Sequence, residues 1–275
     1  LEWSGKELLF SADEGVYTSV RSLDIANKTS EVVLQGGEVV ISSGIYLVNN
    51  SLFFSGETKL HPREVYSYVL PKKLIKRLTD NNQWLIDVQL AKQERVVYEA
   101  RDGREVEGVL VWPLNYTSGS RYPLIVHIHG GPEACEKDGW QSTYGKWGQM
   151  AAAEGFFVFY PNYRASTGRG VDYVMEGFGD PVGKEFEDVI DGIDYLVNLG
   201  FVNKEKVGIG GGSYGGYFAN WGATKYTDRF AAAVSFVGIS NTFSKALTTD
   251  IPQEDYLVHW GFYPHDKPEK YMERS

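Results

Sequence analysis

The chain has 275 residues, of which 43% are hydrophobic, so it can fill the core of one large domain or two ordinary ones and is not disordered. Its net charge of -9, without a cluster of Lys and Arg, excludes the basic footprint of a nucleic-acid-binding protein. No apolar run is long enough to span a membrane, so no membrane partner is expected.

The only cysteine is Cys135, which excludes an intrachain disulfide and a thiolate metal cluster. We interpret it as a bystander in a loop or at a helix start. The five histidines do not cluster at ligand spacing with acids, so we expect no metal and no cofactor. The chain opens at Leu1 rather than Met, and we expect its natural start to be missing. The compartment (cytoplasmic, periplasmic or secreted) and the oligomeric state stay open.

Residues 1–90 contain short strand-like segments that echo one another at an interval of about 44 residues, which is typical of β-propeller blades. Segments 8–10, 22–25 and 32–34 are echoed by 52–54, 67–70 and 75–78. Turn signals predict separate strands at 39–41, 45–48 and 52–54. We expect about two blades, with further blades upstream because a propeller needs at least four. An unrelated β-sandwich is the alternative.

From residue 91 onward the pattern changes to that of an α/β domain. Asp102-Gly103 lies between two apolar runs and predicts a hairpin. Buried strands are then expected at 124–128, 156–160, 207–209 and 231–236, with helices over 144–154, 186–197 (ended by Gly200) and 217–225. Such alternation predicts a parallel sheet. We therefore assign residues 91–275 to a second domain.

The most specific motif is a glycine-rich turn around Ser213 that fits G-x-S-x-G and lies between a strand and a helix, as in a nucleophile elbow. A serine at such a turn presents its hydroxyl to substrate. Gly211 and Gly215 are expected where side chains would collide. The N–H of Tyr214 is a natural donor to an oxyanion.

Two other interpretations fit this turn. Gly210, Gly212 and Gly215 also fit G-x-G-x-x-G of a dinucleotide fold, but that fold needs an acid at the end of the next strand, and Asp228 precedes it. A purely structural glycine-rich turn is the second.

A second motif, His129-Gly130-Gly131-Pro132, follows the strand expected at 124–128. In α/β-hydrolases the second oxyanion donor comes from the loop after this strand. Gly130 and Gly131 allow the main chain to approach a substrate carbonyl, because they lack a Cβ atom. An ordinary tight turn is the alternative for this motif alone.

Together with 162–168 (Asn-Tyr-Arg-Ala-Ser-Thr-Gly), these motifs give the chain a resemblance to the prolyl oligopeptidase family of serine peptidases, most closely its acylaminoacyl-peptidase-like branch. The resemblance is clear from residue 95 to the end. Residues 1–90 share only a propeller-like pattern of short strands with that family. It implies an α/β-hydrolase domain behind a β-propeller that restricts access, and short peptides as substrates. It also implies Ser213 as nucleophile, with the backbone N–H groups of Tyr214, Gly130 and Gly131 as oxyanion donors.

Other polar residues near these motifs receive structural interpretations. Arg164 is expected to form an ion pair with Glu187 or Asp188, with a substrate carboxylate as the alternative. His127 is expected in the core, whereas His129 can border the site without acting as the base.

The triad Asp and His of a serine hydrolase are not found in this chain. The order Ser, acid, His requires them on loops after later strands. His259, His265, Asp250 and Asp255 follow no such strand. We therefore expect a fragment that is inactive alone, taken from a serine oligopeptidase or exopeptidase. A carboxylesterase and a non-catalytic propeller-based binding protein are the alternatives.

Overall fold

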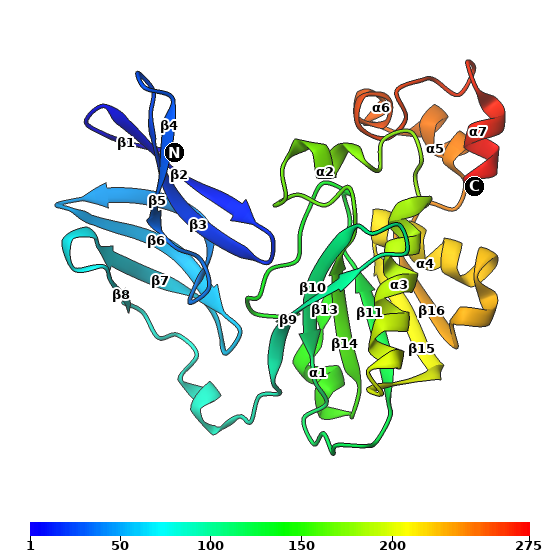
Figure 1. Ribbon diagram of the computed structural model, residues 1–275, viewed down its shortest axis with the longest axis horizontal. Coiled ribbons are helices and arrows are strands. Elements are labelled where there is room, and N and C mark those ends of the chain that lie inside the picture. Colours follow the sequence, from blue (N-terminus) through cyan, green and yellow to red (C-terminus); the bar gives the residue numbers. More distant parts are fainter.

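The computed structural model describes residues 1–275. The chain forms two parts that lie side by side, an N-terminal part of β-strands and a C-terminal part in which strands and helices alternate (Figure 1). A connecting segment that contains the 3-10 helix η2 (Gln83–Asp87) joins them. None of the helices combines the length and the apolar composition needed to cross a membrane.

The N-terminal part consists of two antiparallel sheets, each with four strands in the order of the chain. The first contains β1 (Glu2–Ser4), β2 (Glu7–Glu14), β3 (Tyr17–Asp24) and β4 (Thr29–Leu34). The second contains β5 (Val40–Val48), β6 (Ser51–Thr58), β7 (His61–Val69) and β8 (Leu74–Arg77), with the short helix η1 (Leu70–Lys72) before β8.

The repeat in the sequence reflects equivalent strands of these two sheets. β2 and β6 begin at residues 7 and 51, and β3 and β7 begin at 17 and 61, so both pairs are offset by 44. The prediction of separate strands at 39–41 and 45–48 was wrong, because residues 40–41 and 45–48 belong to the single strand β5. Gly44, with φ +58°, lies at an irregularity in the pairing of β5 with β6 and not at a turn.

The C-terminal part is built on a six-stranded sheet with the order β16-β15-β11-β14-β10-β9. Its strands are β9 (Gln93–Glu99), β10 (Glu105–Val111), β11 (Tyr122–Ile128), β14 (Phe157–Asn162), β15 (Val202–Gly212) and β16 (Ala232–Phe236). β9 and β10 form the predicted antiparallel hairpin, with Gly103 at φ +84° in its turn. The other four strands are parallel, as expected.

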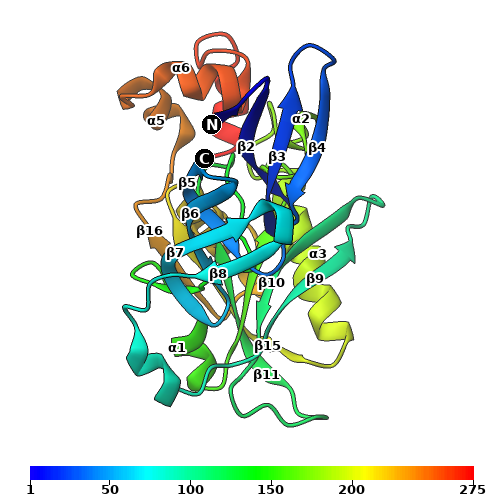
Figure 2. The same cartoon turned by 90° about the vertical axis from the view of Figure 1, so that its left-hand side faces the viewer.

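Helices cover this sheet on both faces, which explains why every residue of β14 is buried. Phe157 and Phe159 pack in a cluster with residues of α3 (Lys184–Asn198) and α4 (Tyr214–Lys225). Val158 and Tyr160 point the other way and pack in a cluster with Ala152 of α1 (Gly148–Ala153). Figure 2 shows α1 and α3 on opposite sides of the sheet.

Two helix predictions need adjustment. The helix expected over 144–154 is shorter, because a small hairpin of β12 (Ser142–Thr143) and β13 (Lys146–Trp147) precedes α1. The helix expected over 217–225 begins earlier, at the residue that follows Ser213. The remaining elements are helical: α2 (Val171–Met175), η3 (Thr227–Arg229), α5 (Thr242–Thr248), α6 (Pro252–Glu254), the π-helix η4 (Asp255–Trp260) and α7 (Pro268–Glu273).

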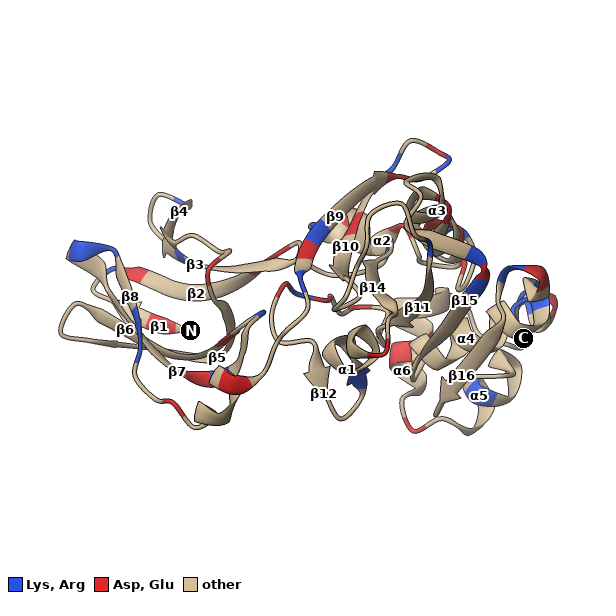
Figure 3. Cartoon of the chain, turned by 90° about the horizontal axis from the view of Figure 1, so that it is seen from below, with Lys and Arg blue, Asp and Glu red and all other residues tan.

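The turn between β2 and β3 inserts into the C-terminal part. Val16 is fully buried and packs with apolar residues of β10 and β14. Its carbonyl oxygen accepts a hydrogen bond of 2.7 Å from the N–H of Asp138, and the N–H of Gly15 donates to Gly168 O at 2.8 Å. The two parts therefore share buried side chains and backbone hydrogen bonds. Acidic and basic residues are interspersed over both parts (Figure 3).

β16 forms an edge of the sheet, because it pairs only with β15, and its apolar side chains are exposed. Val234 is 55% and Phe236 is 61% exposed. Open apolar edge strands pair with other chains, and a charge on the edge opposes this. We predict that Val234→Lys lowers concentration-dependent association of the chain, measured by light scattering. Tyr144→Lys, at a residue 98% exposed outside this strand, should have little effect, and equal effects of the two would contradict the edge explanation.

Candidate active site

The pairing of β11 with β15 brings the two glycine-rich motifs together. These strands are parallel neighbours, with His127 opposite Gly210 and Ile128 opposite Gly211. Continuing this register by two residues places Gly130 beside Ser213. A methyl group added at Gly130 would lie 3.3 Å from Ser213 Cβ and 3.1 Å from the carbonyl oxygen of Gly212. Ser213 and Gly130 are thus in backbone proximity at the carboxyl ends of adjacent strands.

Ser213 lies at the sharp turn between β15 and α4. Its backbone has φ 56° and ψ -117°, a conformation that is costly for a residue with a side chain and is typical of active sites. The N–H of Ser213 donates to Phe236 O at 2.9 Å, and its carbonyl accepts from Tyr217 N at 3.0 Å. Its side chain makes no capping hydrogen bond with α4. The residue is exposed, so its hydroxyl is open to solvent at a strained turn.

Gly211 and Gly215 lie where a side chain cannot fit. A Cβ atom at Gly211 would be 2.2 Å from Ile128 O, and one at Gly215 would be 2.1 Å from the same oxygen. Both glycines therefore allow the elbow to pack directly on the end of β11. This contact sets the distance between the serine turn and the loop that begins at His129.

Backbone N–H groups near Ser213 are available to bind an oxyanion. Tyr214 is the first residue of α4, so its N–H has no acceptor within the helix. A methyl group at Gly130 would lie 3.8 Å from Tyr214 N, which puts this donor close to the glycine loop. Gly131 adopts φ +123°, a region that favours glycine. The positive end of the α4 dipole adds to the attraction of a negative charge at this point.

His129 fixes the glycine loop. Its Nε2 is 2.9 Å from Ser166 Oγ, its Nδ1 is 2.8 Å from Gly130 O, and its ring stacks on Tyr163 at 4.5 Å. The Tyr163 hydroxyl donates to His129 O at 3.0 Å. Burial lowers the pKa of His129, which keeps the ring neutral. With both nitrogens engaged, His129 is a positioning residue for the loop. Tyr163 and Ser166 belong to segment 162–168, so these contacts explain why that segment occurs together with the glycine motif in the sequence.

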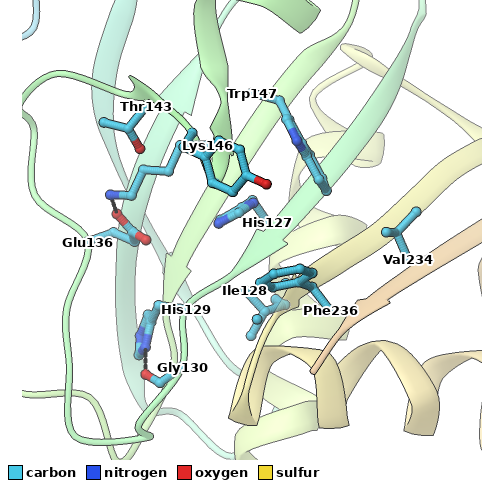
Figure 4. A pocket seen from close by; sticks show the side chains of 14 residues that line it. His127, Ile128, His129, Gly130, Glu136, Thr143, Lys146, Trp147, Val234 and Phe236 are labelled. Carbon is cyan, nitrogen blue, oxygen red and sulfur yellow. Dashed lines mark hydrogen bonds and ion pairs between the residues drawn. The ribbon is translucent and has the colours of Figure 1, made fainter. Parts of the chain in front are cut away.

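A cavity of about 580 Å³ lies beside these turns (Figure 4). His129, Gly130 and Gly212 line it next to the elbow, and Val234 and Phe236 line it from β16. In Figure 4 Lys146 points toward Glu136, with which it forms an ion pair. Ser213 does not line this cavity, although its neighbour Gly212 does.

The side chain of Tyr214 points into the core and anchors the elbow to α3. Its hydroxyl donates to Glu185 Oε1 at 2.5 Å, and the N–H of Val182 donates to the same oxygen at 2.6 Å. Oε2 of Glu185 is buried and has no partner. Burial raises the pKa of Glu185 to about 8, which is expected for a carboxyl group without a cation beside it. The sequence had not indicated this contact.

Arg164 forms the expected structural ion pair. Its guanidinium makes two hydrogen bonds to Asp188, of 2.8 and 2.6 Å, and two to Asp102. These hydrogen bonds to Arg164 lower the pKa of Asp102 to about 2. Glu187 pairs with Arg101 instead. Arg164 is buried, and four of its five N–H donors are used by the two acids, so its charge is already balanced by structural partners.

No histidine of the chain is hydrogen-bonded to Ser213. His127 is buried in the core and packs against Trp147 and Tyr160. His259 is buried 3.5 Å from Asp255, with its ring against that of Tyr214. His265 is exposed at the surface.

The fifth histidine, His61, corrects the expectation that no histidine groups with acids. In the second sheet, ligand atoms of His61, Glu64 and Asp80 lie within 4.8 Å of one another. The spacing did not indicate this group, because His61 and Glu64 are three positions apart on β7, where alternation predicts opposite faces, and Asp80 lies sixteen positions further on, after β8.

Two other residues considered from the sequence lie away from this chemistry. Asp228 is in η3, before β16, whereas Ser213 bonds to Phe236 at the far end of that strand. This position does not suit the ribose-binding acid of a dinucleotide site. Cys135 is a free, half-buried thiol, and burial raises its pKa, which opposes formation of the thiolate.

The parallel sheet and the strand–serine–helix turn define an α/β-hydrolase fold. Residues 143–275 match the model of the prolyl oligopeptidase family. The resemblance found in the sequence is thereby confirmed, and these residues belong to that family.

Relatives and solved structures agree with this assignment. The chain is 34% identical, over 78% of its length, to the uncharacterized peptidase YuxL of Bacillus subtilis, and 35% identical, over 55%, to dipeptidyl aminopeptidase BIII of Pseudoxanthomonas mexicana. It aligns over 99% of its length with the acylaminoacyl peptidase of Pyrococcus horikoshii, with 26% identity and a TM-score of 0.85. It spans 32% and 22% of the two relatives and 42% of the solved chain.

The packing of the elbow on β11 leads to a stability prediction. Gly215→Ala should destabilise the chain by at least about 2 kcal/mol, because the new methyl group would overlap Ile128 O. Thermal or urea unfolding followed by circular dichroism measures this. Gly145→Ala is the control, since nothing lies within 4 Å of its added methyl group. Similar losses in both variants would contradict the predicted contact.

The raised pKa of Glu185 predicts a pH dependence of stability. The folded chain holds the proton up to a pH of about 8, whereas an unfolded glutamate releases it near its ordinary value of 4.5. This acid therefore destabilises the fold progressively as the pH rises from about 4.5 to 8. Glu185→Gln should be more stable than the wild type at pH 8, by an amount on the order of 2–4 kcal/mol, and the difference should shrink at pH 4.

Urea unfolding at several pH values tests this dependence. The exposed Glu154→Gln serves as the control, and its stability should follow the wild type at each pH. A Glu185→Gln variant whose stability relative to wild type does not change between pH 4 and pH 8 would refute the assignment of a neutral Glu185.

Proposed function

We propose that the protein is a serine peptidase that hydrolyses short peptides through an acyl-enzyme on Ser213. The observation that carries this proposal is the proximity of Ser213, at its strained turn, to Gly130 and the N–H of Tyr214. Hydroxyl nucleophiles at such a turn, facing backbone donors, perform acyl transfer. The names of the relatives, peptidases and a dipeptidyl aminopeptidase, support the same reaction class.

In this reaction Ser213 Oγ forms a bond to the scissile carbonyl carbon and passes its proton to a general base. The carbonyl oxygen becomes an oxyanion, which the N–H groups of Tyr214 and of Gly130 or Gly131 stabilise. The C–N bond then breaks, and the leaving amine takes the proton from the base. Water attacks the acyl-enzyme in the reverse sense and releases the acid.

We infer that the general base and its carboxylate partner come from parts of the whole protein outside this sequence. Each of the five histidines contacts groups other than Ser213, and the chain spans about a third of the length of its first curated relative. Residues 1–275 alone are therefore expected to show no appreciable activity.

We also propose that the two N-terminal sheets, residues 1–90, are blades of a β-propeller. Each has four antiparallel strands in chain order, and β2–β3 and β6–β7 repeat at an offset of 44 residues. A propeller beside the serine turn would limit access to short, flexible chains. This feature favours a peptidase over a carboxylesterase with the same elbow, and a non-catalytic binding protein is the remaining alternative.

A fluorophosphonate probe, which reacts with activated serines, tests the proposal on the whole protein. We predict labelling that Ser213→Ala abolishes and that Ser240→Ala, at an exposed bend of the same part, leaves unchanged. The chain of residues 1–275 alone should label at least about a hundredfold more slowly, because it lacks the base. Labelling that persists in Ser213→Ala, or a whole protein that does not label, would overturn the proposal.

A substrate panel then separates the two enzyme classes. The whole protein without the probe is expected to cleave aminoacyl, dipeptidyl or N-acyl peptide anilides, and its Ser213→Ala variant is expected to cleave none of them. Turnover of p-nitrophenyl esters without cleavage of any peptide bond would show an esterase instead.

A further inference from the structure

We propose that His61, Glu64 and Asp80 form a binding site for a divalent transition-metal cation of the zinc type in the second N-terminal sheet. His61 and Glu64 lie on β7, and Asp80 follows β8. One ligand atom from each lies within 4.8 Å of the other two. The site is separate from the serine chemistry and does not depend on the proposed peptidase activity.

A β-bulge brings the first two residues together. On a regular strand, residues three apart point to opposite faces. Thr58 pairs with His61, and Gly56 pairs with Glu64. Two residues separate these pairs on β7 but only one separates them on β6, so β7 contains an extra residue. An extra residue of this kind re-aims the side chains that flank it, and bulges are common at functional sites. His61 and Glu64 can therefore face the same point, although their spacing predicts the opposite.

The hydrogen bonds of His61 leave a lone pair on the nitrogen that faces the acids. Nδ1 lies 2.9 Å from the carbonyl oxygen of Pro62, which can only accept, so the proton of the neutral ring is on Nδ1. Nε2 then carries the lone pair. It is fully buried and makes no hydrogen bond, although it lies 3.3 Å from Asp80 Oδ1. An imidazole lone pair and a carboxylate oxygen at this distance repel each other unless a ring proton or a metal cation lies between them.

The distance suits two ligands of one ion. Zinc with bonds of about 2.0–2.2 Å in tetrahedral geometry places neighbouring ligand atoms roughly 3.3–3.6 Å apart. In such a site the ion would not lie on the line between the two ligand atoms. The bond from Nε2 to the ion would make an angle of about 35° with that line, so the nitrogen lone pair would point beside the carboxylate oxygen and not at it. This geometry agrees with an Nε2 atom that lies near Asp80 without forming a hydrogen bond to it.

Glu64 is held in place as a metal-ligating carboxylate usually is. The residue is only 3% exposed. It accepts hydrogen bonds from the Thr79 hydroxyl, from the N–H of Asn81 at 2.6 Å and from Asn81 Nδ2 at 2.8 Å. Asn82 Nδ2 also donates to Oε1, at 3.4 Å. Ligating carboxylates are typically oriented by such outer contacts, and an ion at Glu64 would replace this longest hydrogen bond on Oε1.

The remaining charge at the site is compatible with a divalent cation. Arg77 lies 3.0 Å from Asp80 Oδ1 and balances one of the two carboxylates. With a neutral His61 the group has a net charge of -1, counted from Glu64, Asp80 and Arg77. Asp80 is 44% exposed at its side chain, so an ion can enter from solvent and complete its coordination with water. Imidazole and carboxylate together favour zinc over magnesium, which takes oxygen ligands.

Isothermal titration of the whole protein, freed of metals with a chelator, tests the site with zinc chloride and with magnesium chloride. We expect one zinc ion per chain at this site, weakened at least about tenfold in both His61→Gln and Asp80→Asn. The exposed His265→Gln is the matched control and should bind zinc as the wild type does. Magnesium should not compete for the site.

Two results would overturn the inference. One is the absence of zinc binding by the wild type, and the other is binding that both substitutions leave unchanged. Asp80 is exposed, so Asp80→Asn is expected to fold, which circular dichroism verifies, and it keeps the test valid if His61→Gln unfolds. Zinc binding does not require Ser213, so Ser213→Ala must titrate like the wild type whether or not the peptidase proposal holds.

Discussion

The in-register parallel pairing of β11 with β15 is the constraint on which the candidate active site depends. Because Ile128 lies opposite Gly211, the residues that follow the two strands emerge side by side at one edge of the sheet. Gly211 and Gly215 permit this by packing against the carbonyl oxygen of Ile128, where any side chain would collide. The strained serine, the first amide of α4 and the glycine loop are then neighbours because of the sheet, and no long side chain has to reach between them.

Supporting contacts hold this arrangement from both sides. His129, Tyr163 and Ser166 fix the loop after β11, and Glu185 holds the tyrosine that follows the serine. Neither set is hydrogen-bonded to Ser213 itself. They occupy positions from which they determine the direction of backbone donors, and preorganised donors account for much of the power of such sites.

Much of this architecture could be predicted from the sequence, because it depends on local signals. Asp102-Gly103 marked its hairpin, and the glycine pattern around Ser213 marked a strand–turn–helix, since both patterns are set by backbone conformation over a few residues. Contacts between distant residues were missed. Glu185 and Tyr214 are 29 positions apart, and the bulge in β7 reversed the direction that alternation predicts for His61 and Glu64. Irregularities and long-range pairs leave no periodic trace in a sequence.

The buried tip of the β2–β3 turn has a consequence for motion. Val16 sits among side chains of β10 and β14, and backbone bonds on either side of it join the two parts of the chain. Separating the parts there would expose an apolar side chain to water and leave two amide groups without partners. Glu57 and Lys59 of the second sheet contact Trp140 N and Asp138 in the same region, so a rotation of the parts at this turn would break polar and apolar contacts together.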